Sequence, residues 1–285
     1  MTSYLRQKFQ SLTVSEDAKH GDLDSQNREE IERTRILTAK ALVLQQDPSA
    51  KDVDDLMIRR FLRARDLDVD KASAMFLKYL KWRRESIPNG FISPSEITNE
   101  LAQNKLFVQG HDKAGRPIML VFAARHKPAS TTVEEIKRFV IYILEKICSR
   151  MPNGHEKFTT IADLHGWGYA NSDIRGYLAA LTILQDCYPE RLGKLLIINA
   201  PYIFMTAWKM VYPFIDKNTK RRVAILPNST YISLPKTLRN LSCIFFQIVF
   251  VEDKKLRPTL LQDIDEDQLP DSVGGPLKLV PIQDC

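Results

Sequence analysis

The chain has 285 residues, 44% of them hydrophobic and 27% charged, and a formal net charge of +6. This length suits one large domain with a smaller companion, and the composition is ordinary for a soluble globular protein. The modest positive charge allows a basic face toward anionic lipid or nucleic acid, but a solvated surface explains the same number. The strongly apolar stretch 241–251 is far shorter than the ~20 residues of a membrane-spanning helix, and the first ten residues lack the apolar run of a secretory signal.

The N-terminal part of the chain is predicted to be a tail followed by helices. Residues 1–27 are polar and lack apolar periodicity, so we expect a mobile tail there. Over residues 28–95, apolar side chains recur at intervals of three and four positions, as in the stretch 72–82. A loop containing Pro88, Gly90 and Pro94 closes this helical region.

From residue 96 onward, strand and helix patterns alternate. Strands are predicted at 117–124, 158–164, 195–198 and 249–251, and helices at 136–147, 174–188 and 203–212. The spacing of Thr132 and Glu135 is that of a capping box, and the wholly apolar run Leu195–Ile198 suits a strand covered on both faces. The sequence therefore predicts an α/β protein: an N-terminal helical subdomain plus a mixed, largely parallel sheet lobe (96–276) with crossover helices, and a tail at 277–285.

Motifs for catalysis, metal binding and nucleic-acid binding are missing from the sequence. Gly166 and Gly168 begin a dinucleotide-type pattern, but Asn171 stands where its third glycine belongs. There is no GxSxG elbow, and the five histidines lack metal-ligand spacing. The basic clusters at 59–65 and 220–222 lack interleaved aromatic residues, and the four cysteines are scattered as in a cytosolic protein. We therefore expect no catalytic residue, no metal, no cofactor and no nucleic-acid partner.

Four segments follow one another along the chain: LMIRRFLRAR at 56–65, FTTIADLHGW at 158–167, CYPERLGKLLIINAPYIFMTAWKMVYPFID at 187–216 and LPDSVGG at 269–275. In this order they resemble the CRAL-TRIO family. The resemblance covers roughly residues 50–276. It implies N-terminal helices and a mixed α/β lobe that encloses one lipid in a cavity, with a bound phospholipid as ligand.

The resemblance also implies residues that contact the lipid head group. Glu190 matches the family's inositol-contacting glutamate, and Arg65 matches a basic residue near the inositol phosphate. Thr219 and Arg222 stand where inositol-binding members have Thr and Lys. Thr160 matches one half of the Ser-x-Thr pair of phosphatidylcholine binders. For each of these residues, a surface charge or an ordinary structural contact is the competing interpretation.

Two positions depart from the family pattern. Asp66 replaces a lysine of some phosphatidylinositol binders, which predicts weaker affinity for the phosphate. Phe158 replaces the serine that binds the choline lipid's phosphate, which makes phosphatidylcholine doubtful as a second ligand.

The segment 203–215 resembles the family's gate, a helix that swings open and dips into the bilayer surface. We expect its large apolar side chains to contact the membrane; they are Phe204, Met205, Trp208, Val211, Phe214 and Ile215. The basic residues nearby favour an anionic surface; they are Lys209, Lys217, Lys220 and Arg221. A well-buried core helix is the competing interpretation of this segment.

The expected function is that of a monomeric, cytoplasmic, reversibly membrane-associated protein. It would bind phosphatidylinositol and other phospholipids, and transfer or present them at membrane surfaces. Two alternatives remain open: a carrier of another hydrophobic molecule, tocopherol- or retinoid-like, and a non-transferring interaction module with a vestigial pocket.

One segment, Val223–Gln247, has no counterpart in the family pattern. Removing it joins Arg222 to Ile248 and gives KRRIVFVEDKKL, which resembles the family without a gap. Valine codons begin with GT, and Phe-Phe-Gln can be encoded by a pyrimidine tract ending in CAG. The sequence thus predicts a retained intron or an isoform-specific insert that loops out of the working fold, with a genuine surface insertion as the alternative.

Overall fold

The computed structural model describes residues 29–217, 223–225, 247–251 and 255–284. The chain divides into two compact units, Met1–Leu80 and Lys81–Cys285.

The first unit is helical, as predicted. A helix over residues 29–46 is followed by the short 3-10 helix η1 (Pro48–Asp52), by α2 (Asp55–Ala64) and by α3 (Val69–Ser86), which ends in the second unit. The rings of Phe61 and Phe76 meet edge to face with centroids 4.9 Å apart. Arg63 binds Glu32 through two hydrogen bonds and so ties α2 to the preceding helix. Aromatic packing and this ion pair stabilise the unit.

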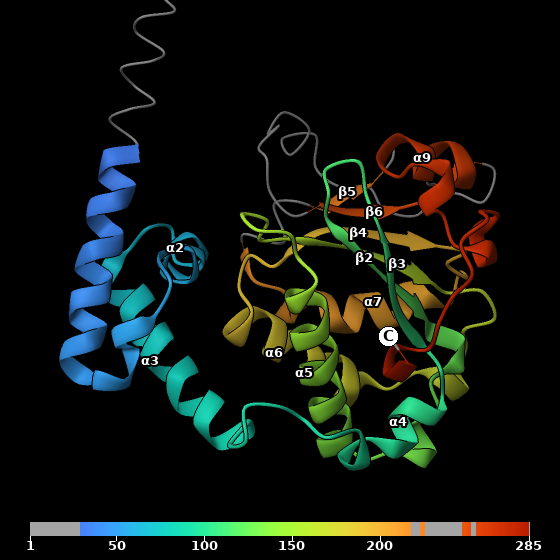
Figure 1. Ribbon diagram of the computed structural model, residues 1–285. Helices are drawn as coiled ribbons and strands as arrows, with labels where there is room; N and C mark the ends of the chain where they lie inside the picture. The colour runs from blue at the N-terminus through green and yellow to red at the C-terminus, as the bar shows by residue number, and fades with distance from the viewer. Residues whose placement is uncertain (1–28, 218–222, 226–246, 252–254, 285) are drawn as a thin grey trace, which may run out of the picture. The chain divides into compact units, whose positions relative to one another are not determined.

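The second unit is built on a six-stranded mixed sheet (Figure 1). Its strand order is β1 (Leu106–His111), β2 (Pro117–Phe122), β3 (Phe158–Asp163), β4 (Leu192–Ile198), β6 (Gln247–Phe250), β5 (Val223–Ile225). Strand β1 is antiparallel to β2, and every other neighbouring pair is parallel. The prediction of a mixed, largely parallel sheet is confirmed.

Helices cover both faces of this sheet. On one side lie α5 (Val133–Ser149), α6 (Ile174–Cys187) and α7 (Phe204–Val211), and on the other lies α9 (Leu256–Asp263), as Figure 1 shows. A five-residue helix, α4 (Thr98–Ala102), precedes β1. Short 3-10 helices occur at Pro94–Glu96, Ala123–Arg125, Pro128–Ser130, Tyr169–Asn171, Tyr212–Phe214, Glu266–Gln268, Asp271–Val273 and Ile282–Asp284.

The two faces of the sheet are packed to different degrees. On the α9 side, the strand residues Ile118, Ile161 and Leu196 are completely buried against a cluster that includes Leu260. On the opposite side, alternate residues of the same central strands stay partly accessible; they are Met119, Val121, Ala162 and Leu195. Thr160 and Ile197 on this face are buried, so its accessible surface is confined to particular side chains. We call the face that α5, α6 and α7 cover the helix-covered face.

Several elements differ from the sequence prediction. The strand expected over 117–124 ends at Phe122, because Ala123–Arg125 turn into a 3-10 helix. Thr132 caps α5 by accepting from the backbone nitrogen of Glu135, but the Glu135 carboxylate accepts from the backbone nitrogens of Asn99 and Glu100 at the start of α4. Half of the predicted capping box is therefore present.

The ends of the predicted insert take part in the sheet. Val223–Ile225 form strand β5, which pairs in parallel with β6, and Gln247 begins β6 itself. For these residues the expectation of a loop outside the fold was wrong. Residues 226–246 lie outside the described residues, and the expectation for them stays a prediction.

Candidate functional site

Glu190 lies in the tight turn between α6 and β4. Its backbone adopts a left-handed conformation with φ of 59°, which is uncommon for a residue other than glycine. Its side chain is only 9% exposed, and the carboxylate oxygen Oε2 lies 3.8 Å from Nζ of Lys157. A nearly buried carboxylate in a strained turn is a feature that a ligand site would explain.

The turn is anchored through its first residue, Tyr188. The Tyr188 hydroxyl donates to Oε1 of Glu145 at 2.6 Å, and Arg83 donates to both oxygens of that carboxylate at 3.0 and 3.2 Å. Burial raises the pKa of Glu145, but the hydrogen bonds from Arg83 and Tyr188 outweigh it and lower this pKa below its ordinary value. Trp82 packs edge to face against Tyr188, with centroids 6.2 Å apart. We call Arg83, Glu145 and Tyr188 the turn clamp.

Thr160 lies on β3, between Met119 of β2 and Leu195 of β4. Its side chain belongs to the helix-covered face, because Ile161 packs on the opposite one. The residue is 4% exposed, and its hydroxyl has no hydrogen-bond partner among the described residues. Phe158, two positions earlier, is completely buried. A buried hydroxyl without a partner is costly, so Thr160 is a candidate ligand contact.

The other predicted head-group residues lie in the first unit or outside the described residues. Arg65 belongs to the first unit, where it ends α2 and donates to the carbonyl oxygen of Ala64 at 3.0 Å. Asp66, which follows it, adopts φ of 53°. Thr219 and Arg222 lie outside the described residues.

Helix α7 packs one side on the sheet and leaves other side chains exposed. Ala207 is buried, Phe204 meets Trp167 edge to face at 5.4 Å, and Trp208 meets Phe250 in the same way at 5.4 Å. Met205 and Val211 are partly buried, and Ile215 is buried.

Exposed apolar side chains lie at both ends of α7. Tyr202, just before the helix, is 75% exposed, and Met210 and Phe214 at its other end are 47% and 59% exposed. The six predicted gate residues therefore differ in their environments, and Phe214 is the most exposed of them.

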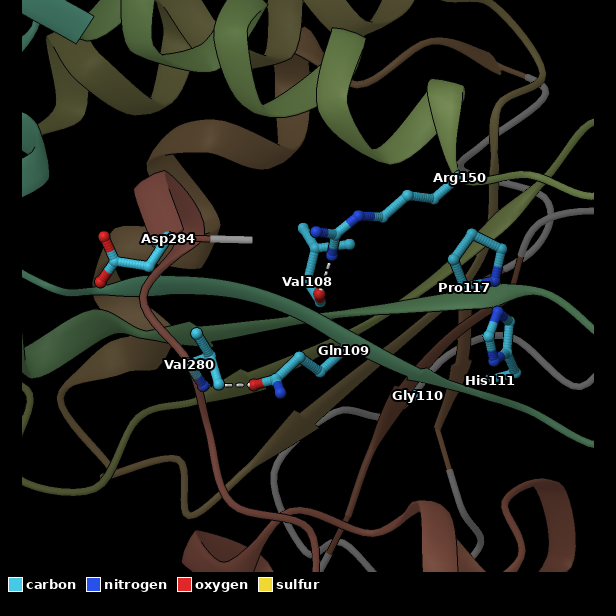
Figure 2. Close-up of a pocket in the computed structure, with 8 residues that line it drawn as sticks. All are labelled: Val108, Gln109, Gly110, His111, Pro117, Arg150, Val280 and Asp284. Atoms are coloured by element: carbon cyan, nitrogen blue, oxygen red, sulfur yellow. Dashed lines mark hydrogen bonds between the residues drawn. The ribbon is translucent and has the colours of Figure 1, made fainter.

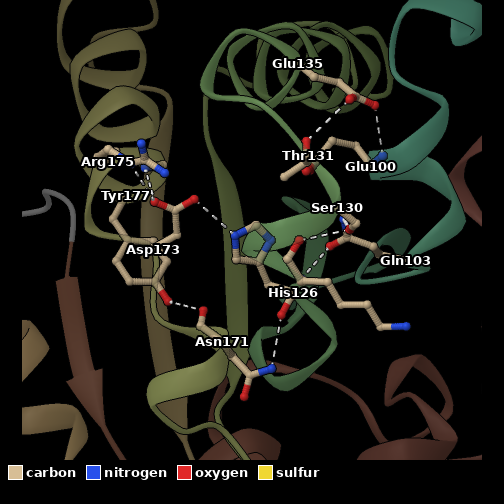
Figure 3. A network of polar contacts seen from close by, with 12 residues as sticks. Glu100, Gln103, His126, Ser130, Thr131, Glu135, Asn171, Asp173, Arg175 and Tyr177 are labelled. Atoms are coloured by element: carbon tan, nitrogen blue, oxygen red, sulfur yellow. Dashed lines mark hydrogen bonds and ion pairs between the residues drawn. The ribbon is translucent and has the colours of Figure 1, made fainter.

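A buried polar network that the sequence analysis missed lies beside α6 (Figure 3). Nζ of Lys105 lies 2.7 Å from the Glu100 carboxylate and 2.6 Å from Nδ1 of His126, whose Nε2 faces Asp173 at 3.6 Å. Asp173 caps α6 by accepting from the backbone nitrogen of Gly176. Burial and the neighbouring Lys105 lower the pKa of His126. No local spacing signals this network, because its members come from separate elements.

Hydrogen bonds continue from the same region toward α7. Asn171 donates to the carbonyl oxygens of Ala124 and His126 and accepts, through its own carbonyl, from the Tyr177 hydroxyl at 3.1 Å. Trp167 donates to that hydroxyl at 3.0 Å and also contacts Phe204 of α7. The polar network and the aromatic packing of α7 thus share Trp167.

A pocket of about 560 Å³ lies elsewhere, at the edge of β1 (Figure 2). Arg150 reaches the carbonyl oxygen of Val108 there, and Gln109 accepts from the backbone nitrogen of Val280 at 2.6 Å. None of the predicted site residues lines this pocket. Because the sequence analysis did not predict β1, it gave no sign of the pocket.

Within the part of the chain that the structure describes, no helix is long and apolar enough to cross a membrane. The same residues contain no group of three or more His, Cys, Asp or Glu side chains that would hold a metal ion.

The helical first unit and the mixed sheet define an α/β fold that is also found among solved structures. The crystal structure of Sfh5 matches 88% of this chain and 93% of its own, with a TM-score of 0.58 and 14% sequence identity, so this likeness is one of fold. Residues 101–240 match the CRAL/TRIO domain.

Two related proteins match longer stretches of the chain than residues 101–240. "Sec14 cytosolic factor" of Schizosaccharomyces pombe is 30% identical over 256 residues, which cover 84% of this chain and 80% of the relative. "Phosphatidylinositol transfer protein CSR1" of Eremothecium gossypii is 31% identical over 184 residues, 61% of this chain and 42% of the relative. The chain belongs to the CRAL/TRIO domain family, as the four segments predicted.

Proposed function

We propose that the protein binds single phosphatidylinositol molecules and transfers or presents them at membrane surfaces. One of its relatives is named a phosphatidylinositol transfer protein and another a cytosolic factor. The observation that carries the proposal is the nearly buried Glu190 carboxylate, in a left-handed turn at the start of β4.

The helix-covered face of the sheet supports the binding of acyl chains. Its central side chains, such as Val121, Ala162 and Leu195, are apolar but remain partly accessible beneath α5, α6 and α7. Covering the accessible part of these apolar side chains with a lipid chain is favourable.

Polar groups beside this face support the binding of a head group. The Glu190 carboxylate would accept hydrogen bonds from inositol hydroxyls, and the Thr160 hydroxyl would gain a partner inside the lobe. Arg65, Thr219 and Arg222 complete the proposed set, with the arginines as phosphate ligands.

Membrane contact is proposed for the exposed side chains around α7. Met210 and Phe214 would enter the bilayer interface, and the exposed Lys209 and Lys217 would favour anionic lipid. We propose that the protein works in this way as a cytoplasmic monomer that associates with membranes reversibly.

A vesicle assay with a Glu190→Ala variant tests the proposal. Wild-type protein is expected to extract phosphatidylinositol from vesicles, and Glu190→Ala to extract it roughly tenfold less, because hydrogen bonds to a charged group are lost. Glu134→Ala, which removes an exposed carboxylate of α5, serves as the matched control and should behave as wild type. Equal uptake by wild type and by a Glu190→Ala, Arg222→Ala double variant would refute the site.

A further inference from the structure

Helix α7 is attached to the lobe differently from α5 and α6, which cover the same face of the sheet. Side chains of α5 and α6 form hydrogen bonds with neighbouring elements: Glu145 accepts from Arg83 at 3.0 Å, and Gln185 accepts from the backbone nitrogen of Asp216 at 2.7 Å. The side chains of Phe204–Val211 make no hydrogen bond or ion pair with any described residue. Apolar packing alone therefore joins the side chains of α7 to the rest of the lobe.

One aromatic contact joins the start of α7 to a part of the lobe that hydrogen bonds hold in place. Phe204, the first residue of α7, meets the ring of Trp167 edge to face, with centroids 5.4 Å apart. Trp167 is 5% exposed, and its Nε1 donates to the Tyr177 hydroxyl at 3.0 Å. Because an edge-to-face contact depends on the orientation of both rings, the hydrogen bond that orients Trp167 also supports its contact with Phe204.

The partners of Trp167 are themselves fixed. The Tyr177 hydroxyl donates to the backbone carbonyl oxygen of Asn171 at 3.1 Å, as Figure 3 shows. The side chain of Asn171 donates to the carbonyl oxygens of Ala124 and His126 at 2.7 and 3.0 Å. Burial raises the pKa of Tyr177 above its ordinary value of 10.0, so the hydroxyl keeps the proton that it donates. Trp167 thus presents a firmly oriented ring to α7.

A lipid chain that is to cover the helix-covered face must displace one of the helices above it. Apolar side chains of that face, such as Val121 and Leu195, lie beneath α5, α6 and α7 (Figure 1). Helix α7 has eight residues, against 17 in α5 and 14 in α6. The shortest helix, whose side chains have no polar contact to lose, is the one that moves at the lowest cost.

The hydrogen bond between Trp167 and Tyr177 favours α7 in the position seen in the structure, which we call closed. In the closed position the Trp167 indole is buried, so its nitrogen depends on the Tyr177 hydroxyl for a partner. When α7 moves away, water reaches the indole and can take the place of that hydroxyl. Loss of the hydroxyl therefore penalises the closed position more than the open one.

We propose that Trp167, Tyr177 and Asn171 form a latch that holds α7 closed and limits the rate of lipid exchange. Tyr177 is a positioning residue: its hydroxyl orients the Trp167 ring against Phe204. This inference rests on the proposed function and adds to it the residues that control how fast lipid enters and leaves. The competing role for Trp167 and Tyr177 is support of the fold alone.

The test breaks the same hydrogen bond from each side in the full chain. Tyr177→Phe removes the hydroxyl and keeps the ring, Trp167→Phe removes the N–H donor and keeps an aromatic ring, and a double variant combines them. Tyr142→Phe is the matched control, because Tyr142 is a buried tyrosine of α5 outside the latch. The rate at which each protein moves labelled phosphatidylinositol between vesicles is measured, together with the amount of lipid bound at saturation and the unfolding midpoint.

The expected result is faster exchange without loss of binding capacity. Tyr177→Phe should exchange phosphatidylinositol roughly fivefold faster than wild type, because a hydrogen bond that favours the closed position is lost. The amount of lipid bound at saturation should stay the same, and Tyr142→Phe should keep the wild-type rate. In the Trp167→Phe background, Tyr177→Phe should cause no further change, since the donor through which the hydroxyl acts is already gone.

Three results would overturn the latch. The first is a wild-type or slower exchange rate in Tyr177→Phe; a slower rate with a lower unfolding midpoint is the result expected if the two residues only support the fold. The second is an equal acceleration by Tyr142→Phe, and the third is a full additional effect of Tyr177→Phe in the Trp167→Phe background. Each of these leaves the proposed function intact as long as wild-type protein transfers phosphatidylinositol. If wild-type protein transfers none, the proposed function fails and the latch fails with it.

Discussion

At the scale of single residues, the turn clamp explains why Glu190 is held in an unfavourable backbone conformation. Tyr188 lies two positions before Glu190, and its hydroxyl is fixed by Glu145, which is itself fixed by Arg83. A left-handed, non-glycine residue costs about 1–3 kcal/mol and persists only where its surroundings enforce it. We therefore propose that the clamp acts on the site by positioning Glu190.

We predict that Tyr188→Phe weakens phosphatidylinositol uptake. The variant keeps the ring that packs on Trp82 and removes only the hydroxyl, so the protein should still fold, with a loss of about 1 kcal/mol in the free energy of unfolding. Uptake should fall several-fold because the Glu190 turn loses its anchor. Tyr169→Phe, which alters a tyrosine that is 77% exposed, is the control. Wild-type uptake by Tyr188→Phe would show that the clamp does not position Glu190.

A second prediction concerns the buried His126 and the dependence of the free energy of unfolding on pH. Its pKa in the folded protein is lowered from 6.5 by burial and by Lys105, so the unfolded chain takes up the proton first. The free energy of unfolding should therefore fall as the pH drops below about 6.5, by at most about 1.4 kcal/mol per pH unit for this one group. The lowered pKa of Glu145 acts only below pH 4.5, outside this window.

Urea unfolding of wild type and His126→Gln between pH 7 and pH 5 measures this effect. The variant lacks the titrating group, so its stability should depend less steeply on pH. If the free energy of unfolding depends on pH equally in the two proteins, His126 is not the group that titrates.

At the scale of elements, α7 combines packing on the sheet with exposed apolar ends, as an interfacial helix requires. We predict that Phe214→Ala weakens binding to anionic vesicles several-fold, because a side chain that is 59% exposed loses its apolar contact. Phe91→Ala removes a phenylalanine that is 64% exposed elsewhere in the unit and is the control. Raising the salt concentration should weaken binding further by screening Lys209 and Lys217. If neither added salt nor Phe214→Ala changes vesicle binding, the surface of the protein that contacts the membrane lies elsewhere.

The elements that sequence patterns predicted are those with strong local signals. The apolar stretch of β4 and the amphipathic pattern of α5 both lie in one stretch of chain. Strand β1 was missed because its alternation is broken by a bulge at Gly110, where φ is 74°. Helix α9 was missed because it has only eight residues and contains Pro258.

The candidate site was predictable only in part, for a similar reason. Resemblance drew attention to Glu190 and Thr160, but it gave no indication that Lys157 approaches Glu190 or that Arg83 holds Glu145. These contacts join residues from separate elements, and only the folded chain brings them together.

At the scale of the whole molecule, the segment Val223–Gln247 lies in the chain between the gate region and Ile248 of β6. Its described ends add the three-residue edge strand β5 and the first residue of β6. The central pairing of β4 with β6 also involves Ile248, Val249 and Phe250, which follow the segment.

We predict that deleting residues 223–247 leaves a folded protein with equal or higher lipid uptake and unfolding midpoint. Among the described residues, the deletion removes the edge strand β5 and Gln247, and it retains Ile248, Val249 and Phe250, which pair with β4. Vesicle extraction and thermal unfolding of the two forms measure the outcome, and sequencing of transcripts shows whether a shorter form exists. The segment is an integral part of the fold if its deletion abolishes lipid binding and every transcript encodes it.

The identity of the lipid carried by the protein tests the account most directly. The full chain is purified from cells under native conditions, and the co-bound molecule is identified by mass spectrometry, with the Glu190→Ala variant measured in parallel. We expect one phosphatidylinositol per wild-type protein and a marked loss of that lipid from the variant. A tocopherol- or retinoid-like ligand in the wild-type protein, or no bound lipid at all, would contradict the proposed function.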